Sequence, residues 1–235
     1  MNTYISKFLD LIYVRKCLNC EGIIRYNSKN KWFCSNCNEF ELVKNTHLTC
    51  HRCGRTIEYI GYCPICNSNE VNYNRGHCLF EYNKKISRAI IRYKFLDHKV
   101  YSEYFSNLMI NVLKDEGYDY DYICGVPAYK SKKRKRGYSQ TELIAKRISK
   151  ELNIEYRELL KKVKNTQQQS KLTAIQRKAN IKNTFKCTED LEGKKILLID
   201  DVLTTGYTIN ECSRVLNNDG KNTVDFFVIA STNRI

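Results

Sequence analysis

Four Cys-x-x-Cys pairs, which together use eight of the twelve cysteines, occupy the first part of this 235-residue chain. The pairs are Cys17/Cys20, Cys34/Cys37, Cys50/Cys53 and Cys63/Cys66. A Cys-x-x-Cys turn directs two thiolates at one ion, and a second such pair completes the tetrahedral shell that Zn²⁺ prefers. Because four thiolates leave no open coordination position, the spacing predicts two structural zinc sites and no catalytic one.

The distance between the pairs suits two small ribbons. Thirteen residues separate the pairs of the first set and nine separate those of the second, enough for a hairpin in each. Gly54 and Gly61 fall where the second ribbon needs permissive backbone at its turns. His47, His51 and His77 lie nearby, but with eight thiolates available we expect them at the surface. The alternative, redox or buried cysteines without metal, fits four regularly spaced pairs poorly.

Beyond residue 75 the pattern changes to alternating helices and strands, and the four remaining cysteines are scattered. This change predicts a double zinc-ribbon module in residues 1–75 and a second domain in residues 76–235. Apolar periodicity and apolar runs predict helices over 99–114, 139–152 and 208–219, and strands over 122–126, 196–199 and 224–230. Such alternation is typical of an α/β fold with a mostly parallel sheet and helices on both faces.

Two of the predicted helices begin with a capping-box pattern, in which Ser or Thr is followed three residues later by Glu. The patterns are Ser139-x-x-Glu142 and Thr208-x-x-Glu211. They predict that the hydroxyl group of Ser139 or Thr208 caps the first turn of its helix.

The stretch from Ile196 to Thr208 joins a buried strand, two adjacent carboxylates, a hydroxyl-rich loop and the start of a helix. Open α/β sheets bind ligands at the carboxyl ends of their strands. Backbone N–H groups of such a loop and helix start form a pocket for a phosphate dianion. The residues expected at this pocket are Asp200, Asp201, Val202, Thr204, Thr205, Gly206, Tyr207 and Thr208. An ordinary strand end would account for the Asp pair alone, but not for the whole stretch.

A second candidate ligand-binding segment is the run from Lys130 to Arg136, in which six of seven residues are basic. The run lies between a predicted strand and a predicted helix, so we expect it at the same end of the sheet. Arg134 and Arg136 are the candidates for binding pyrophosphate, and the run also suits a nucleic-acid backbone. A solvated basic loop is the alternative. The net charge of +15 favours anionic partners, although abundant Lys, Asn, Ile and Tyr also fit a biased genome.

The amino-terminal residues lack the basic start and unbroken apolar core of a signal peptide. No window reaches the roughly 18 uninterrupted apolar residues of a membrane-spanning helix. We therefore expect a cytoplasmic protein without a membrane span, in which reduced cysteines bind metal rather than form disulfides.

The stretch from 196 to 208 resembles the signature with which type I phosphoribosyltransferases bind 5-phosphoribosyl pyrophosphate (PRPP). Nearly the whole chain resembles the ComF/ComFC competence family, whose members join an amino-terminal zinc ribbon to a phosphoribosyltransferase-like domain. The matching segments are Arg92-Tyr93-Lys94-Phe95, Arg136-Gly137-Tyr138-Ser139-Gln140, Gln168-Gln169-Ser170-x-Leu172, Arg177, Asn180, Phe185 and the Asp-Asp-Val-x-Thr-Thr-Gly loop. The chain departs from the family at Ser139, where Asn is usual, and before Cys17, where a Pro is common.

The resemblance implies a ligand, a cofactor and residue roles. PRPP or a related phosphoribosyl ligand would bind with Mg²⁺, and Asp200 and Asp201 would be the catalytic residues, anchoring the ribose hydroxyls. Residues 204–208 would hold the 5-phosphate, and residues 168–177 would form a hood over the site. The resemblance also implies a role in natural transformation, with single-stranded DNA and a competence helicase or DNA-uptake protein as partners.

Three functions stay open on the sequence alone. The first is a DNA-handling competence protein that binds PRPP, and the second is a metabolic phosphoribosyltransferase that acts on a base or amine. The third is a PRPP-sensing regulator. No residue can be nominated as the general base toward an acceptor, so the sequence leaves open whether transfer is catalysed.

Overall fold

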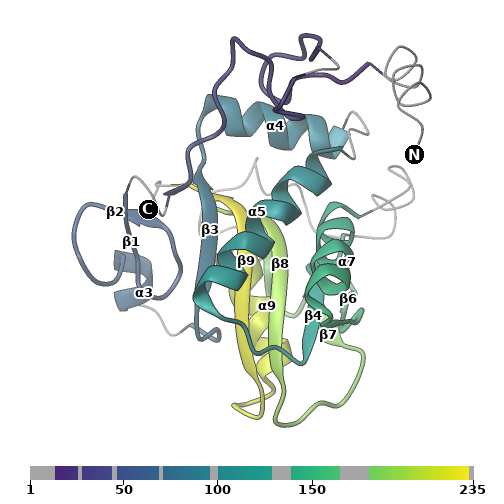
Figure 1. The fold of residues 1–235 in the computed structure, drawn as a ribbon. Coiled ribbons are helices and arrows are strands. Elements are labelled where there is room, and N and C mark those ends of the chain that lie inside the picture. Colours follow the sequence, from purple (N-terminus) through teal and green to yellow (C-terminus); the bar gives the residue numbers. More distant parts are fainter. Residues whose placement is uncertain are drawn as a thin grey trace.

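The computed structural model describes residues 14–25, 28–43, 47–68, 71–95, 100–128, 139–164 and 180–232. A twisted sheet runs through the middle of the molecule, and helices lie on both of its sides (Figure 1). The sheet has five strands in the order β3-β9-β8-β4-β5, and all of its neighbouring strands are parallel. The strands are β3 (Gly76–Glu81), β9 (Thr223–Ser231), β8 (Lys195–Leu203), β4 (Tyr122–Gly125) and β5 (Glu155–Tyr156).

Side chains that alternate along the strands face two separate apolar clusters. Leu197 and Ile199 of β8 face one cluster, and Ile196 and Leu198 face the other. The first side is covered by α4 (Lys84–Phe95), α5 (Val100–Glu116) and α7 (Gln140–Leu152). The second side is covered by α9 (Tyr207–Asn217) and the antiparallel pair β6 (Leu160–Lys162) and β7 (Phe185–Cys187). This arrangement confirms the predicted parallel α/β sheet with helices on both faces.

The element boundaries differ from the predicted ones at informative places. Strand β8 continues past Ile199 to Leu203, so Asp200 and Asp201 belong to the strand itself. The predicted side-chain caps of the two helices are wrong. Ser139 is the N-cap of α7 but makes no side-chain cap hydrogen bond, because its hydroxyl pairs with that of Thr141. The helix α9 has Gly206 as its N-cap and starts at Tyr207, which leaves Thr208 inside the first turn.

The two cysteine modules contribute to different apolar clusters. The first cysteine module, residues 14–43, contributes Leu18, Phe33 and Phe40 to the cluster that α4 and α5 cover. The second cysteine module, residues 47–68, contains β1 (Leu48–Thr49), β2 (Thr56–Ile57) and α3 (Pro64–Ser68). Its four cysteines belong to the other cluster. The elements of this module lie beside edge strand β3 (Figure 1). Within the described ranges, no helix is long and apolar enough to cross a bilayer.

Candidate functional site

The central strand β8 leads directly into the turn that the sequence singles out. We call residues 204–208 the phosphate loop; they connect β8 to helix α9. Gly206 has φ +81°, a left-handed conformation that favours glycine, and this reversal lets α9 start at the next residue. The first backbone N–H groups of a helix have no partner within the helix, so they are available to an anion.

The residues expected at the pocket are brought together at this strand-to-helix turn. Leu203 is buried, whereas Asp200, Asp201, Val202 and all five residues of the phosphate loop are half-buried. Half-burial keeps their polar groups within reach of a ligand while the buried strand fixes their positions. The geometry therefore has the carboxylates, hydroxyl groups and helix start that a phosphorylated sugar requires.

The two adjacent carboxylates create an electrostatic problem in the absence of a ligand. Burial, together with the charge of Asp201, raises the pKa of Asp200 from 3.8 to about 8. Lys94, near the end of α4, forms an ion pair with the Asp201 carboxylate. A bound cation would relieve the same repulsion, and carboxylate oxygens are the ligands that Mg²⁺ prefers. The donor set thus fits Mg²⁺ carried by a phosphorylated ligand.

Lys94 contacts the carboxylate pair, a contact that the sequence motifs did not predict. The Tyr93 hydroxyl donates to the carbonyl of Gln140 at 2.6 Å, and the Gln140 side-chain amide donates to the carbonyl of Lys94 at 3.3 Å. Thr141 donates to the carbonyl of Val126 at 2.9 Å. These bonds join the end of α4, the start of α7 and the end of β4, so that Lys94 reaches the carboxylate pair.

Several other predicted site residues lie outside the described residues. They are Arg134 and Arg136, with the whole basic run 130–136, and the expected hood, residues 168–177. Strands β6 and β7 precede and follow the hood segment and pair with each other, Lys162 opposite Phe185. The carboxylate of Glu211 on α9 accepts a hydrogen bond from the backbone of Asn183 at 2.7 Å. The chain that follows the hood segment is thereby tied to the helix of the phosphate loop.

Each cysteine module brings four sulfur atoms together. In each set the ligand atoms lie within 4.8 Å of one another. The Sγ atoms of Cys20 and Cys34, and those of Cys53 and Cys63, are 3.7 Å apart. A tetrahedron with metal–sulfur bonds of about 2.3 Å has edges of about 3.8 Å, so both sets fit Zn²⁺. The second set is fully buried, whereas Cys20 of the first is exposed.

The turn glycines of the second module have the predicted backbone freedom. Gly54 has φ +68° and Gly61 has φ +132°. At Gly54 a Cβ atom would also approach the carbonyl oxygen of Gly76 to 2.6 Å. The turn after Cys53 can therefore lie directly against the start of β3 only because residue 54 has no side chain.

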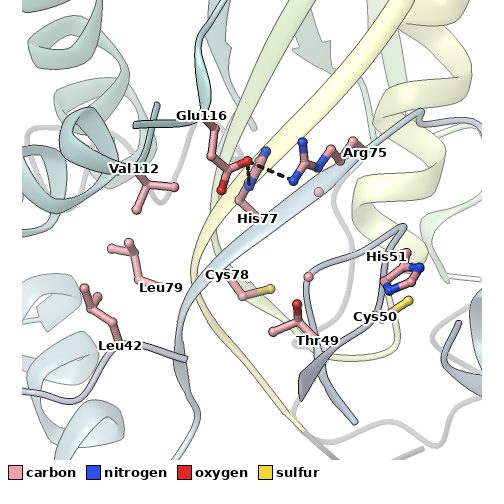
Figure 2. Close-up of a pocket in the computed structure, with 12 residues that line it drawn as sticks. Leu42, Thr49, Cys50, His51, Arg75, His77, Cys78, Leu79, Val112 and Glu116 are labelled. Carbon is pink, nitrogen blue, oxygen red and sulfur yellow. Dashed lines mark ion pairs between the residues drawn. The ribbon is translucent and has the colours of Figure 1, made fainter. Parts of the chain in front are cut away.

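A cavity of about 230 Å³ lies between the second cysteine module, β3 and α5 (Figure 2). Arg75 and His77 converge there on Glu116, with Arg75 Nη2 at 2.8 Å and His77 Nδ1 at 3.7 Å from its carboxylate. His47 and His51 are exposed as expected, but the side chain of His77 is only 12% exposed. Burial lowers the pKa of His77, which favours the neutral form of the ring, although the charge of Glu116 acts in the opposite direction. The residues lining this cavity are separate from the phosphate loop.

The carboxy-terminal part of the chain matches a family of known proteins. Residues 139–234 match the family model of the phosphoribosyl transferase domain. The matched segment includes β8, the phosphate loop and α9. The predicted type I phosphoribosyltransferase-like fold, joined to an amino-terminal module with two four-cysteine clusters, is thereby confirmed.

Relatives with similar sequences extend over most of the chain. Competence protein F of Haemophilus influenzae is 28% identical over 225 residues, which cover 92% of this chain and 96% of that protein. DNA utilization protein YhgH of Shigella flexneri is 26% identical over 206 residues, 85% of this chain and 90% of that protein. Competence protein ComFC of Streptococcus pneumoniae is 27% identical over 194 residues, 76% of this chain and 85% of that protein.

Proposed function

We propose that this chain acts in natural transformation and binds PRPP or a closely related ligand, because it is similar to competence proteins F and ComFC and its residues 139–234 match the phosphoribosyl transferase domain. The observation that supports this ligand is the turn at the end of β8, where two carboxylates precede a helix whose N-cap is a glycine. In this proposal residues 1–75 are the zinc-binding module and residues 76–235 are the ligand-binding domain.

The phosphate loop would hold the 5-phosphate of the ligand. The backbone N–H groups at the start of α9 and the hydroxyl groups of Thr204, Thr205 and Thr208 are donors, and a phosphate offers only acceptors. Thr204 and Thr205 lie on the loop, and Thr208 lies in the first turn of α9. Because all of these donors come from one short turn, a single dianion can satisfy them together.

The carboxylate pair would bind the ribose. Asp200 and Asp201 accept hydrogen bonds from adjacent sugar hydroxyls, and their charge stabilises positive charge that develops at C1 during loss of pyrophosphate. Bound Mg²⁺, held beside Asp200 and Asp201, would supply positive charge that neutralises the departing pyrophosphate. Lys94 has its ammonium group beside Asp201, where it is a candidate partner for pyrophosphate. Arg134 and Arg136 of the basic run are further candidates.

Handling of single-stranded DNA is the second part of the proposal. The net charge of +15 and the six basic residues between 130 and 136 suit a phosphate backbone. The name of one relative, DNA utilization protein YhgH, associates that protein with DNA. The eight clustered thiols suit a reducing compartment, so the cytoplasm is the proposed location, with a competence helicase or DNA-uptake protein as a candidate partner.

Binding of a fluorescent single-stranded oligonucleotide over a range of salt concentrations tests this part. Replacing the six basic residues of 130–136 with Gln is expected to weaken binding and to reduce the salt slope by up to about 4. A Lys114→Gln/Lys150→Gln variant, which removes two exposed lysines at helix ends, is the control and should keep most of the affinity. Equal affinity and slope in the native protein and the 130–136 variant would exclude this run as the DNA-binding segment.

A genetic experiment tests the competence role itself. Exchanging the chromosomal gene for an Asp200→Asn/Asp201→Asn allele is expected to lower the transformation frequency with marked DNA. Protein abundance must be unchanged, which immunoblotting checks. A normal transformation frequency in cells that lack the gene altogether would refute the role in transformation.

A further inference from the structure

One buried arginine connects the second cysteine module with the phosphate loop. Arg55 follows Gly54 in the turn of that module, and only 1% of its surface is exposed. Its Nη2 atom donates to the carbonyl oxygen of Thr204 at 2.6 Å, across a sequence separation of 149 residues. Its Nη1 atom donates to the carbonyl oxygen of Thr232, just after β9. A guanidinium group with two donors in a fixed fork thus holds two strand ends together.

The bond to Thr204 bears directly on the geometry of the phosphate loop. The carbonyl of Thr204 and the N–H of Thr205 belong to one planar peptide unit and point in opposite directions. Fixing the carbonyl on Arg55 therefore fixes the direction in which the Thr205 N–H points. That N–H is one of the loop donors to which we assign the phosphate. The backbone of Thr232 also donates to Leu203 at 2.9 Å, so both acceptors of Arg55 border the loop.

The position of Arg55 in turn depends on the cysteine turn. Its carbonyl accepts a hydrogen bond from the backbone of Cys50 at 2.7 Å, and the backbone of Gly54 donates to the carbonyl of Cys50 at 2.9 Å. The backbone of Gly76 donates to the carbonyl of Arg52 at 2.7 Å, which ties the same turn to β3. A metal ion on Cys50 and Cys53 closes this turn, because both thiolates must face the ion.

A second contact joins Asn72, in the segment between the module and β3, to the other side of the loop. The backbone of Asn72 donates to the side-chain oxygen of Asn210 at 2.7 Å, and its side-chain amide reaches the same oxygen at 3.2 Å. The backbone of Asn210 donates to the carbonyl of Gly206 at 2.8 Å. The phosphate loop is therefore held before Thr205 by Arg55 and after it through Asn210.

We propose that Arg55 is a positioning residue through which metal binding at the second cysteine module and phosphoribosyl-ligand binding at the phosphate loop reinforce each other. This inference rests on the proposed binding of PRPP. Coupling between two binding sites is reciprocal: if zinc raises the affinity for PRPP by some factor, PRPP raises the affinity for zinc equally. Couplings of this kind are typically about 5- to 150-fold. Loss of zinc from this module would thus release the ligand, which makes ligand binding responsive to metal supply or thiol oxidation.

The test compares four forms of the full chain, each loaded with zinc: native, Arg55→Met, Arg55→Lys and Arg52→Met. Arg52 is the matched control, since its backbone carbonyl supports the same turn while its side chain is half-buried in the second module. Titration calorimetry with Mg²⁺ and PRPP is expected to show about tenfold weaker binding for Arg55→Met. Arg55→Lys should restore part of this loss, and Arg52→Met should match the native protein.

A second readout separates positioning from a general loss of structure. The rate at which zinc leaves the protein to a chromogenic chelator is measured with and without PRPP. PRPP should slow the release of one of the two zinc ions in the native protein and in Arg52→Met, but not in Arg55→Met. A purely structural role of Arg55 would speed release by the same factor whether or not PRPP is present. The effect of PRPP on zinc release is measured on the native protein alone, so a folding defect in Arg55→Met cannot obscure it.

The outcomes distinguish the two proposals. Absence of Mg²⁺–PRPP binding by the native, zinc-loaded chain would refute the proposed ligand and this inference with it. Binding by the native chain, with equal affinity in Arg55→Met and no effect of PRPP on zinc release, would refute the coupling alone.

Discussion

Replacing Asp200 with asparagine should stabilise the protein without ligand, because the Asp200 carboxylate is partly removed from water and lies beside Asp201. The pKa of Asp200 is raised from 3.8 to about 8 by burial and by Asp201. Between these two pH values the unfolded chain releases the proton while the folded chain keeps it. Stability is therefore greatest at low pH and is lost as the pH rises through 8.

The size of the effect follows from the shift. One pKa unit corresponds to about 1.4 kcal/mol, so the full shift is an upper bound of roughly 6 kcal/mol. Because Asp200 is half-buried and keeps contact with water, we expect about 2–3 kcal/mol at pH 8. Asparagine mimics the protonated carboxyl group and removes this pH dependence.

Urea unfolding of the zinc-loaded protein at pH 6, 7, 8 and 9 measures the effect. The gain in unfolding free energy of Asp200→Asn over the native protein should grow from pH 6 to about pH 8 and level off by pH 9, where Asp200 is ionised in both the folded and the unfolded chain. Asp190→Asn, at an exposed position, is the control and should stay within about 0.5 kcal/mol of the native protein. A variant that is equally stable or less stable at every pH would show that the ionised Asp200 carboxylate does not destabilise the folded protein.

Three further predictions concern the metal, the turn and the cation of the site. Metal analysis of the purified protein should give two zinc ions per chain with all-sulfur coordination in X-ray absorption; a single ion or nitrogen ligands would contradict the assignment. Gly54→Ala should lower the unfolding free energy by about 2–4 kcal/mol, because residue 54 has a positive φ and lies against the carbonyl oxygen of Gly76. An unchanged unfolding free energy in urea denaturation would refute this. Lys94→Met should weaken Mg²⁺–PRPP binding about tenfold in calorimetry, because pyrophosphate loses a cation beside Asp201; full affinity would remove Lys94 from the site.

Strong local patterns predicted the central elements of the fold. The apolar run from Ile196 to Ile199 is the core of β8, and the run from Val224 to Ala230 is the core of β9. Both strands are covered on both faces, so nearly every residue is apolar and the pattern is unmistakable. Edge strand β3 was not predicted, because its sequence Gly-His-Cys-Leu-Phe-Glu mixes polar and apolar residues where the second cysteine module covers it.

The candidate site was predictable only as far as its residues are neighbours in sequence. The carboxylates and the phosphate loop form one continuous segment, and the cysteines have a fixed local spacing. Lys94 and Arg55 reach the same site from other elements, and Arg55 lies 149 residues from the atom that it binds. Contacts of this kind depend on how the helices and strands pack against one another, and local sequence motifs do not show that packing.

Titration of the zinc-loaded protein with Mg²⁺ and PRPP, beside the Asp200→Asn/Asp201→Asn variant, tests the central claim most directly. We predict saturable binding to one site per chain by the native protein and none by the variant, with circular dichroism showing that both are folded. Absence of binding by the folded native protein would contradict a phosphoribosyl site at the end of β8, and equal binding by the variant would place the ligand elsewhere.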